Sequence, residues 1–272
     1  MKLILSLIVF IATVVLFVSG ESYYSIRTDL RKCASPMCGG YFVREIGSNK
    51  TEVYVKSLNQ TVKGGATVSE TQYKFAPSFS VVVKGEINKD DIVVSKIFRL
   101  LPKSNKPFNF DNEMNHFFTV APNGEKNSTT FEIKKLNSNK SEKVKSIENS
   151  YSHDVSLIPM DWLSYKVHSS QSVFTVSGEK MTSNKTVVID YMFISLPDPM
   201  FCPKELMVAS CTNGTIPTYT ATPSRCLLFA GCVHKGVCPL VVPACSEGYT
   251  RNSYDSKPNG CPHYSCIPSF LS

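Results

Sequence analysis

The sequence predicts a mainly β protein with two tandem, duplicated β domains followed by a disulfide-rich C-terminal module. Short segments rich in Val, Ile, Phe, Tyr and Thr alternate with clusters of Gly, Asn, Asp and Ser, which is the pattern of strands and turns. The ten cysteines are unevenly placed: Cys33 and Cys38 stand near the start, and eight fall between Cys202 and Cys266. A length of 272 residues alone suggests about two domains, and the cysteine-rich segment adds a third.

An internal repeat consists of short matches that keep their order along the chain. The matches are Tyr24–Ile26 with Phe118–Val120 at an offset of 94, Tyr41–Ile46 with Phe131–Leu136 and Ser48–Glu52 with Ser138–Glu142 at 90, Val55–Leu58 with Val144–Ile147 at 89, Val83–Glu86 with Val176–Glu179 at 93, and Phe98 and Leu101–Pro102 with Phe193 and Leu196–Pro197 at 95. A period near 90 is too long for a solenoid unit and indicates duplication of a small domain. Coincidence between segments of similar composition is the alternative, since Ser-Asn-Lys occurs four times.

Each copy is expected to have the same strand plan. We expect hairpins between 83–86 and 93–101 and between 176–179 and 187–196, with a short helix at Asp161–His168. The order β-β-(helix)-β-β is compatible with an OB-like barrel. The expected units are a signal peptide at 1–20, a first β domain at 21–103, a linker at 104–115, a second β domain at 116–200 and the cysteine-rich module at 201–272.

The N-terminus has the layout of a secretory signal peptide. Lys2 precedes an apolar run from Leu3 to Val18, and small residues follow up to Gly20. We therefore expect cleavage near Gly20, a secreted mature chain and no stable membrane insertion after cleavage. An uncleaved anchor is the alternative, although the run is shorter than the roughly 20 apolar residues that a spanning helix needs.

Six Asn-X-Ser/Thr acceptor sequences agree with a secretory route. They are Asn49, Asn59, Asn127, Asn139, Asn184 and Asn213, and none has proline at the middle position. Glycans at these positions would require each asparagine to lie on the surface. Because the chain is rich in Asn, Ser and Thr, some of these sequences arise by chance.

The C-terminal module is expected to depend on disulfides. Residues 201–272 contain eight cysteines and eight prolines, and a small proline-rich segment buries too little apolar surface to fold unaided. In an oxidising compartment we expect a local bridge between Cys33 and Cys38, and further bridges among Cys202, Cys211, Cys226, Cys232, Cys238, Cys245, Cys261 and Cys266. The connectivity of the tail stays open. Zinc binding by Cys226, Cys232, His234 and Cys238 is the alternative, but the spacings are not those of a tetrahedral site.

No catalytic constellation stands out in the sequence. Cys38 could form a nucleophile–base pair with His116, His153 or His168, but the nearby Cys33 favours a structural bridge. The sequence contains no G-x-S-x-G elbow, zincin motif, P-loop or dinucleotide fingerprint. We therefore predict no enzyme activity, no cofactor and no metal site.

The net charge of +7 suggests one further contact. The densest basic run consists of Lys134, Lys135, Lys140, Lys143 and Lys145. It could touch an anionic glycan, or it could be a solvated loop. Nucleic acid is not an expected partner, because the chain lacks interleaved basic and aromatic stripes.

Two segments resemble known families. The motif Arg31-Lys32-Cys33-Ala34-Ser35-Pro36-Met37-Cys38-Gly39-Gly40, within Tyr24 to Val43, resembles the opening of a family of bacterial secreted proteins and lipoproteins known only as a domain of unknown function. The likeness continues through Val83 to Pro102 and into the second copy, which lacks the cysteine pair; it implies an extracellular protein and assigns no site residues. In the tail, Cys245–Tyr249 and Gly260–Cys266 resemble antistasin-type inhibitor repeats without their closing C-x-C.

The sequence thus predicts a secreted, N-glycosylated, non-catalytic protein that binds an extracellular protein or glycan. A secreted protease inhibitor acting through the cysteine-rich tail is one alternative, and an extracellular hydrolase without a recognisable motif is another. An exposed loop tethered by bridges in the tail would favour the inhibitor. A concave cleft with clustered His and Asp side chains would favour the hydrolase.

Overall fold

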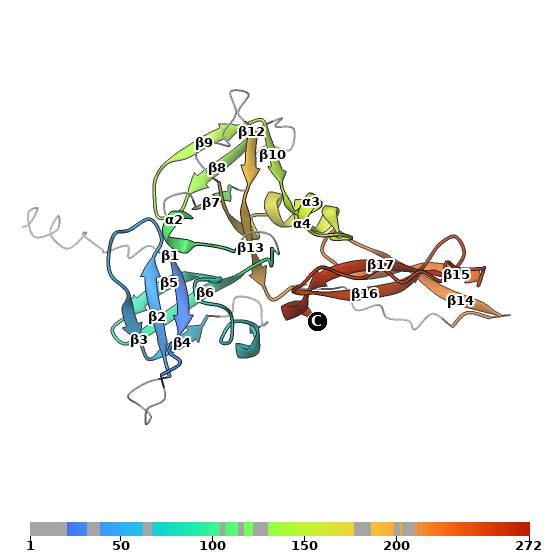
Figure 1. Cartoon of the computed structure of the whole chain (residues 1–272), viewed down its shortest axis with the longest axis horizontal. Coiled ribbons are helices and arrows are strands. Elements are labelled where there is room, and N and C mark those ends of the chain that lie inside the picture. Colours follow the sequence, from blue (N-terminus) through green and yellow to red (C-terminus); the bar gives the residue numbers. More distant parts are fainter. Residues whose placement is uncertain are drawn as a thin grey trace, which may run out of the picture.

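The computed structural model of the chain shows two β rings and a long C-terminal arm (Figure 1). It describes residues 21–31, 39–61, 67–103, 107–113, 117–121, 130–176, 186–198, 202, 210–212 and 214–272. The protein is mainly β, as the sequence predicts. Within these ranges, no helix is both long and apolar enough to cross a bilayer.

Ring 1 is formed by the first copy of the repeat. Its strands are β1 (Ser22–Thr28), β2 (Tyr41–Glu45), β3 (Val53–Val55), β4 (Ser57–Gln60), β5 (Val81–Asn88) and β6 (Asp91–Leu100), with the 3-10 turn η1 (Glu70–Gln72) between β4 and β5. β1 pairs with β2 and β5, β2 with β3, and β5 with β6, all antiparallel, whereas β4 pairs with β6 in parallel. Because only Lys56 separates β3 from β4, these pairings close a ring around Ile26, Val43, Val83 and Ile97.

Ring 2 repeats these pairings. Its strands are β7 (Phe117–Val120), β8 (Phe131–Lys135), β9 (Ser141–Val144), β10 (Ser146–Asn149), β11 (Ser172–Thr175), β12 (Thr186–Ile189) and β13 (Tyr191–Leu196), with helices α3 (Tyr151–Asp154) and α4 (Met160–His168) between β10 and β11. β7 pairs with β8 and β11, β8 with β9, and β11 with β13, while β10 lies parallel to β12. One residue separates β9 from β10 and another separates β12 from β13, so the second ring closes in the same way.

Both rings therefore have the strand order of an OB-like barrel, in which the third strand lies parallel to the fifth. The expected helix at Asp161–His168 is α4, which directs Trp162, Leu163 and Val167 into the core of ring 2. The first expected hairpin is present as β5 with β6. In the second copy β11 pairs with β13, but β11 ends at Thr175, before the expected 176–179, of which 177–179 lie outside the described residues. Because Val82 and Val173 pair with the equivalent residues Phe98 and Phe193, the match of Val83 with Val176 at an offset of 93 is wrong by two positions. Each ring has five strands when β3 with β4, β9 with β10 and β12 with β13 are each counted as one interrupted strand. The duplication predicted from the sequence is thus a duplication of one five-stranded unit.

The two rings share one sheet, because β6 pairs antiparallel with β13. The register places Arg99 opposite Ile194, with Phe98 opposite Ser195 and Leu100 opposite Phe193. At the repeat offset of 95, Phe98 is equivalent to Phe193, Ser195 to Leu100, and Arg99 to Ile194. Exchanging each residue for its equivalent therefore converts the pair Phe98–Ser195 into the pair Phe193–Leu100 and leaves the pair Arg99–Ile194 unchanged. The junction is therefore a local two-fold arrangement of equivalent strands.

A separate apolar core fills the space between the rings. It contains equivalent residues from both copies, namely Ile46 with Leu136, Val82 with Val173, and Phe98 with Phe193. Residues 104–115 are the linker expected from the sequence, yet Phe108 and Phe110 from this segment join the same core. Phe110 lies in α2 (Phe110–Glu113) and stacks on Phe79 of ring 1 with ring centroids 4.9 Å apart.

Asn137 joins the rings through its side-chain amide. Its Oδ1 accepts a hydrogen bond from the backbone N of Tyr23 at 2.7 Å, and its Nδ2 donates to the carbonyl oxygens of Tyr23 and Ile46 at 2.8 and 2.9 Å. Asn137 has a φ of 51°, in the left-handed region that Asn tolerates better than most residues. Gly47, its equivalent in ring 1, has a φ of 75°.

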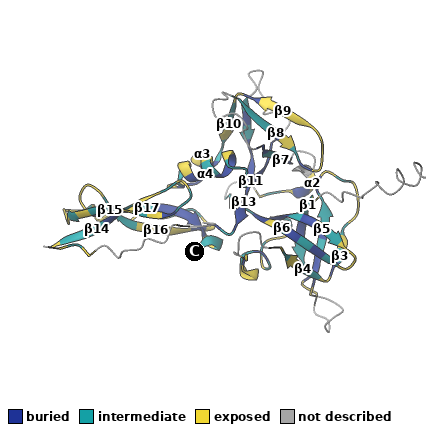
Figure 2. Cartoon of the chain, turned by 180° about the vertical axis from the view of Figure 1, so that it is seen from behind, coloured by how far each residue is buried: buried dark blue, intermediate teal, exposed yellow. Residues whose placement is uncertain are grey.

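The C-terminal arm projects from the rings (Figure 1). It consists of the strands β14 (Thr215–Ala221), β15 (Leu227–His234), β16 (Tyr249–Ser256) and β17 (Cys261–Pro268), followed by the 3-10 turn η3 (Ser269–Leu271). Buried residues are concentrated in the rings, whereas much of the arm is exposed or half-buried (Figure 2).

Candidate functional site

The arm is built from two similar halves, each a hairpin braced by two disulfides. β14 pairs with β15, and β16 pairs with β17. The bridges join Cys202 to Cys226, Cys211 to Cys232, Cys238 to Cys261 and Cys245 to Cys266. In each half, two cysteines before the hairpin bond to cysteines at or within its second strand, at sequence separations of 24 and 21 in one half and 23 and 21 in the other.

The halves also match in sequence. Cys202-Pro203, Leu206-Met207-Val208 and Cys211 correspond to Cys238-Pro239, Leu240-Val241-Val242 and Cys245. The sequence analysis did not predict this second duplication, which lies within the cysteine-rich module. The paired Cys-Pro dipeptides are the signal in the sequence that reveals it.

The expected disulfides of the tail are confirmed, and no cysteine in the described part of the chain is free. Cys226, Cys232 and Cys238 are all oxidised, so they cannot supply thiolates to the alternative zinc site. No group of three or more His, Cys, Asp or Glu side chains with metal-binding geometry occurs among the described residues.

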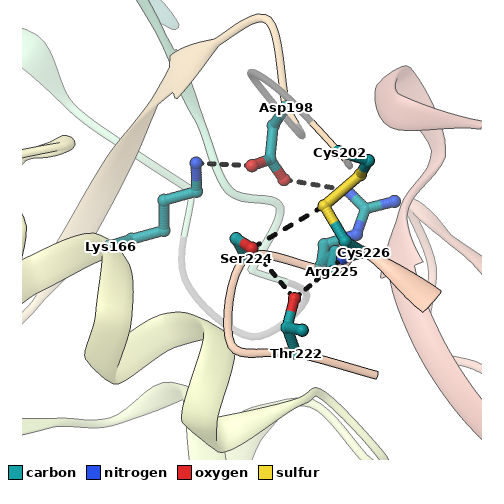
Figure 3. The surroundings of a disulfide bond; sticks show 7 residues. All are labelled: Lys166, Asp198, Cys202, Thr222, Ser224, Arg225 and Cys226. Atoms are coloured by element: carbon teal, nitrogen blue, oxygen red, sulfur yellow. Dashed lines mark hydrogen bonds and ion pairs between the residues drawn. A yellow bond between two sulfur atoms is a disulfide. The ribbon is translucent and has the colours of Figure 1, made fainter. Parts of the chain in front are cut away.

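A buried charge network attaches the arm to ring 2 (Figure 3). The carboxylate of Asp198, just after β13, lies 2.5 Å from Lys166 Nζ of α4 and 2.9 Å from Arg225 Nη1 in the β14–β15 turn. Trp162 Nε1 donates to Asp198 Oδ2 at 3.0 Å, and Lys166 Nζ donates to Gln171 Oε1 at 2.8 Å. Three segments that are distant in sequence therefore meet at one carboxylate.

This network is withdrawn from solvent. The side chains of Lys166 and Asp198 are each 1% exposed, and that of Arg225 is 13% exposed. Burial lowers the pKa of Lys166, while the nearby Asp198 opposes that shift. Among the described residues, these ions are paired with one another and hydrogen-bonded to Trp162 and Gln171, so removing one would leave buried charge unpaired.

A disulfide stabilises the turn that presents Arg225. Cys226 is bonded to Cys202 and donates its backbone N–H to Thr222 Oγ1 at 3.1 Å, and Ser224 Oγ lies 2.9 Å from the same oxygen (Figure 3). Arg225 has a φ of 67°, which is unfavourable for a side chain with a Cβ. The bridge and the ion pair hold the turn in this conformation.

The second half of the arm contacts both rings at its base. Tyr249 Oη donates to the carbonyl of Pro102 at 2.8 Å, and the backbone N of Cys266 donates to the carbonyl of Leu157 at 2.9 Å. Phe270, in η3, lies with its ring 4.6 Å from the guanidinium of Arg99. The arm is therefore a fixed projection of the body.

Along this arm runs the candidate binding element, residues 238–245, which we call the tethered loop. Cys238 and Cys245 fix its two ends to β17, at Cys261 and Cys266. Between them, Leu240 is 96% exposed, Val241 79% and Val242 49%. Contiguous exposed apolar side chains are the kind of surface at which proteins bind partners, which makes this loop the candidate.

The tethered loop is longer than the strand it spans. Cys266 lies five positions after Cys261, roughly 17 Å along β17, whereas Cys245 lies seven positions after Cys238, which is roughly 24 Å for a fully extended chain. The excess allows the loop to bow outward. Among the described residues, no backbone hydrogen bond involves positions 239–242, so their peptide groups are available to a partner.

Three of the six predicted glycosylation sites lie on the surface of the described part of the chain. Asn49, Asn59 and Asn139 are all exposed, and Asn49 and Asn139 occupy equivalent turns of the two rings. Residues 1–20, Cys33, Cys38, Asn127, Asn184 and Asn213 lie outside the described residues. The basic run covers β8, β9 and the residues that follow each of them, and Lys134, Lys140, Lys143 and Lys145 are exposed.

Of the histidines considered for catalysis, the two that the structure describes lie on different helices. His168 ends α4 and stacks on Phe131, with centroids 4.6 Å apart, and burial lowers its pKa. His153 lies in the separate helix α3, and His116 lies outside the described residues. The charge network was not predicted, because Lys166, Asp198 and Arg225 are far apart in the sequence and look like surface charges there.

The comparisons with known proteins do not name a role for the chain. Residues 22–156 match the family described as Domain of unknown function (DUF6748). The match covers ring 1 and continues into ring 2 as far as α3 and the residues just after it. The chain is also similar to an uncharacterized protein of Dictyostelium discoideum, at 29% identity over 94% of this chain and 92% of that protein.

That similarity extends across the arm as well as the rings, since it covers nearly the whole of both chains. No solved structure matches the chain. Function is therefore inferred from the structure, and mainly from the arm, which lies outside the family match.

Proposed function

We propose that this protein is secreted, carries N-linked glycans and acts without catalysis by binding a partner protein through the tethered loop. The observation that carries the proposal is the row of exposed aliphatic side chains from Leu240 to Val242, held between two disulfides. Apolar side chains fixed on a rigid support lose little entropy on binding, because the loop is ordered before the partner arrives.

Secretion is supported by the predicted signal peptide and by the four disulfides, which persist in oxidising compartments. Glycosylation is supported by the exposure of Asn49, Asn59 and Asn139. Treatment of the secreted protein with a peptide N-glycosidase should lower its mass by whole glycans and convert the occupied asparagines to aspartates. A secreted chain with the mass of its bare sequence would contradict this part of the proposal.

The binding function is tested with variants of the loop. Immobilised wild-type protein should capture a partner from extracellular fluid, and the partner, once identified and purified, should bind with a measurable Kd. Replacing Leu240 and Val241 by Asp should weaken binding by about 30-fold or more, as expected for residues at the centre of an interface. Val237→Asp is the matched control, because Val237 is 98% exposed and lies just outside the bridge at Cys238.

Equal affinity of the loop variant and the control variant would refute the loop as the binding element.

A protease inhibitor is the second candidate function. It is favoured by the same observation, since a loop held at both ends by disulfides is suited to resist the enzyme that it occupies.

A further inference from the structure

We propose that the tethered loop occupies the active-site cleft of a serine endopeptidase with an apolar primary specificity pocket, and that Leu240 fills that pocket. This inference rests on the proposed function and assigns its loop to one class of partner. The geometry that points to it is the attachment of both ends of an exposed, extended segment to one strand, β17.

The first argument is the conformation of the loop. Pro239 and Pro243 restrict the residues before them, Cys238 and Val242, to extended backbone. The segment between them forms no turn or helix and makes no backbone hydrogen bond to any described residue. A chain with free peptide groups in an extended conformation is what a partner can bind by strand addition, with side-chain pockets supplying the specificity.

The second argument concerns which side chain enters the pocket. Leu240 is the most exposed of the three aliphatic residues Leu240, Val241 and Val242. It is branched at Cγ, whereas Val241 and Val242 are branched at Cβ and present a short, wide side chain close to the backbone. A deep apolar slot therefore accepts Leu240 better than either valine, and an acidic slot accepts none of them.

The third argument distinguishes an inhibitor from a substrate. Hydrolysis of the Leu240–Val241 peptide bond adds one water and leaves a carboxylate on Leu240 and an amine on Val241. The Cys238–Cys261 and Cys245–Cys266 bridges would hold both new ends on β17. The reverse reaction, which releases that water, is then intramolecular and is favoured by the high effective concentration of the two ends.

The fourth argument is access. The loop lies on an arm that projects away from the rings (Figure 1). A protease–inhibitor interface buries about 800 Å² on each partner and needs little backbone rearrangement. A loop on a fixed projection can meet that requirement, whereas one recessed between the rings could not.

The experiment measures inhibition of three serine endopeptidases, chymotrypsin, elastase and trypsin, by the full secreted protein. We expect inhibition of chymotrypsin or elastase, whose pockets are apolar, and no inhibition of trypsin, whose pocket is acidic. Leu240→Gly should raise the inhibition constant by about 30-fold or more, and Val237→Gly, the matched exposed control, should change it less than about threefold. Leu240→Arg should transfer the inhibition to trypsin.

The tether is tested by removing one bridge. The double variant Cys238→Ser, Cys261→Ser keeps the other three bridges of the arm. We expect it to be cleaved after Leu240 and to inhibit only transiently, whereas the wild-type loop stays intact or reseals. Persistent inhibition by this variant, equal to that of the wild type, would overturn the argument from tethering.

Two outcomes would overturn the inference as a whole. In one, none of the three enzymes is inhibited; in the other, the wild-type loop is cleaved and the enzyme recovers at once. If either occurs while the captured partner still requires Leu240 and Val241 for binding, the proposed function stands and only the protease assignment fails. If loop-dependent binding is also absent, both fail.

Discussion

The rings and the arm hold extended backbone in place by different means. The strands of the rings surround three clusters of buried apolar side chains. The arm contributes few buried apolar residues in the described chain, namely Cys226, Tyr249, Cys266 and Ile267, and relies on four disulfides. A closed ring removes its strand edges and shares its core, whereas a two-stranded hairpin is only marginally stable without further support. The difference teaches that the arm can expose apolar side chains because its fold does not depend on burying them.

The largest expected effect is on the core shared by the rings. Phe193→Ala should lower the free energy of unfolding by about 3–5 kcal/mol, because the ring packs against Phe108 and Phe117 in a fully buried site. Urea unfolding followed by circular dichroism measures this. Phe75→Ala, at a ring 1 position that is 74% exposed, should stay within about 0.5 kcal/mol, and equal losses for the two variants would contradict the shared core.

The attachment between rings and arm should be nearly as sensitive. Asp198→Ala should cost about 3–5 kcal/mol, because it leaves Lys166 and Arg225 buried without their counter-charge. Trp162, the one tryptophan of the chain, donates to Asp198 and reports the change through its fluorescence. Asp90→Ala is the control: it removes an ion pair to Lys56 with both side chains more than half exposed, worth about 0–1 kcal/mol. A loss no greater than that of the control would show that the network does not hold the arm.

A smaller and local effect is expected from one bridge of the arm. The double variant Cys238→Ser, Cys261→Ser should destabilise the second hairpin by about 2–4 kcal/mol, since the bridge restricts the unfolded chain. Hydrogen exchange should speed up in β16 and β17 and stay unchanged in β1 to β13. Faster exchange throughout the rings would mean that the two regions unfold as one unit.

The smallest expected effect concerns the hydrogen bonds of Asn137. Asn137→Gly keeps the left-handed backbone but removes the bonds to Tyr23 and Ile46, at an expected cost of about 1–2 kcal/mol. The control is Lys89→Gly, at an exposed position with a φ of 54°. It should leave the urea midpoint unchanged or raise it slightly. A fall equal to that of Asn137→Gly would assign the cost to glycine entropy instead of the inter-ring bonds.

The sequence was sufficient for the mainly β class, the duplication and the presence of disulfides in the tail. Each of these leaves a local or periodic trace, such as the matches of Tyr41–Ile46 with Phe131–Leu136 or the density of cysteines after Cys202. The pairing of β6 with β13 leaves no such trace. Phe98 and Phe193 would be apolar in any strand that faces a core, so their sequence cannot show that the core lies between two rings.

The site was predictable only in part. Nothing in the sequence marks Leu240-Val241-Val242 as exposed, because apolar residues are usually placed inside. Only the bridges, whose connectivity the sequence leaves open, show that it spans Cys261 to Cys266 from the outside. The charge network is hidden for another reason: Lys166, Asp198 and Arg225 become neighbours only when the arm folds back on α4.

The register between β6 and β13 also bears on the history of the molecule. Two identical rings that met edge to edge about a two-fold axis would make this same contact, in which position 99 faces its own equivalent, position 194. Such a dimer must keep both subunits alike. Once both lie in one chain, mutation can specialise each separately. Here ring 1 has the short turn η1 between its third and fourth strands, whereas ring 2 has α4 at the equivalent place, and Trp162 and Lys166 of α4 bind the carboxylate to which the arm attaches.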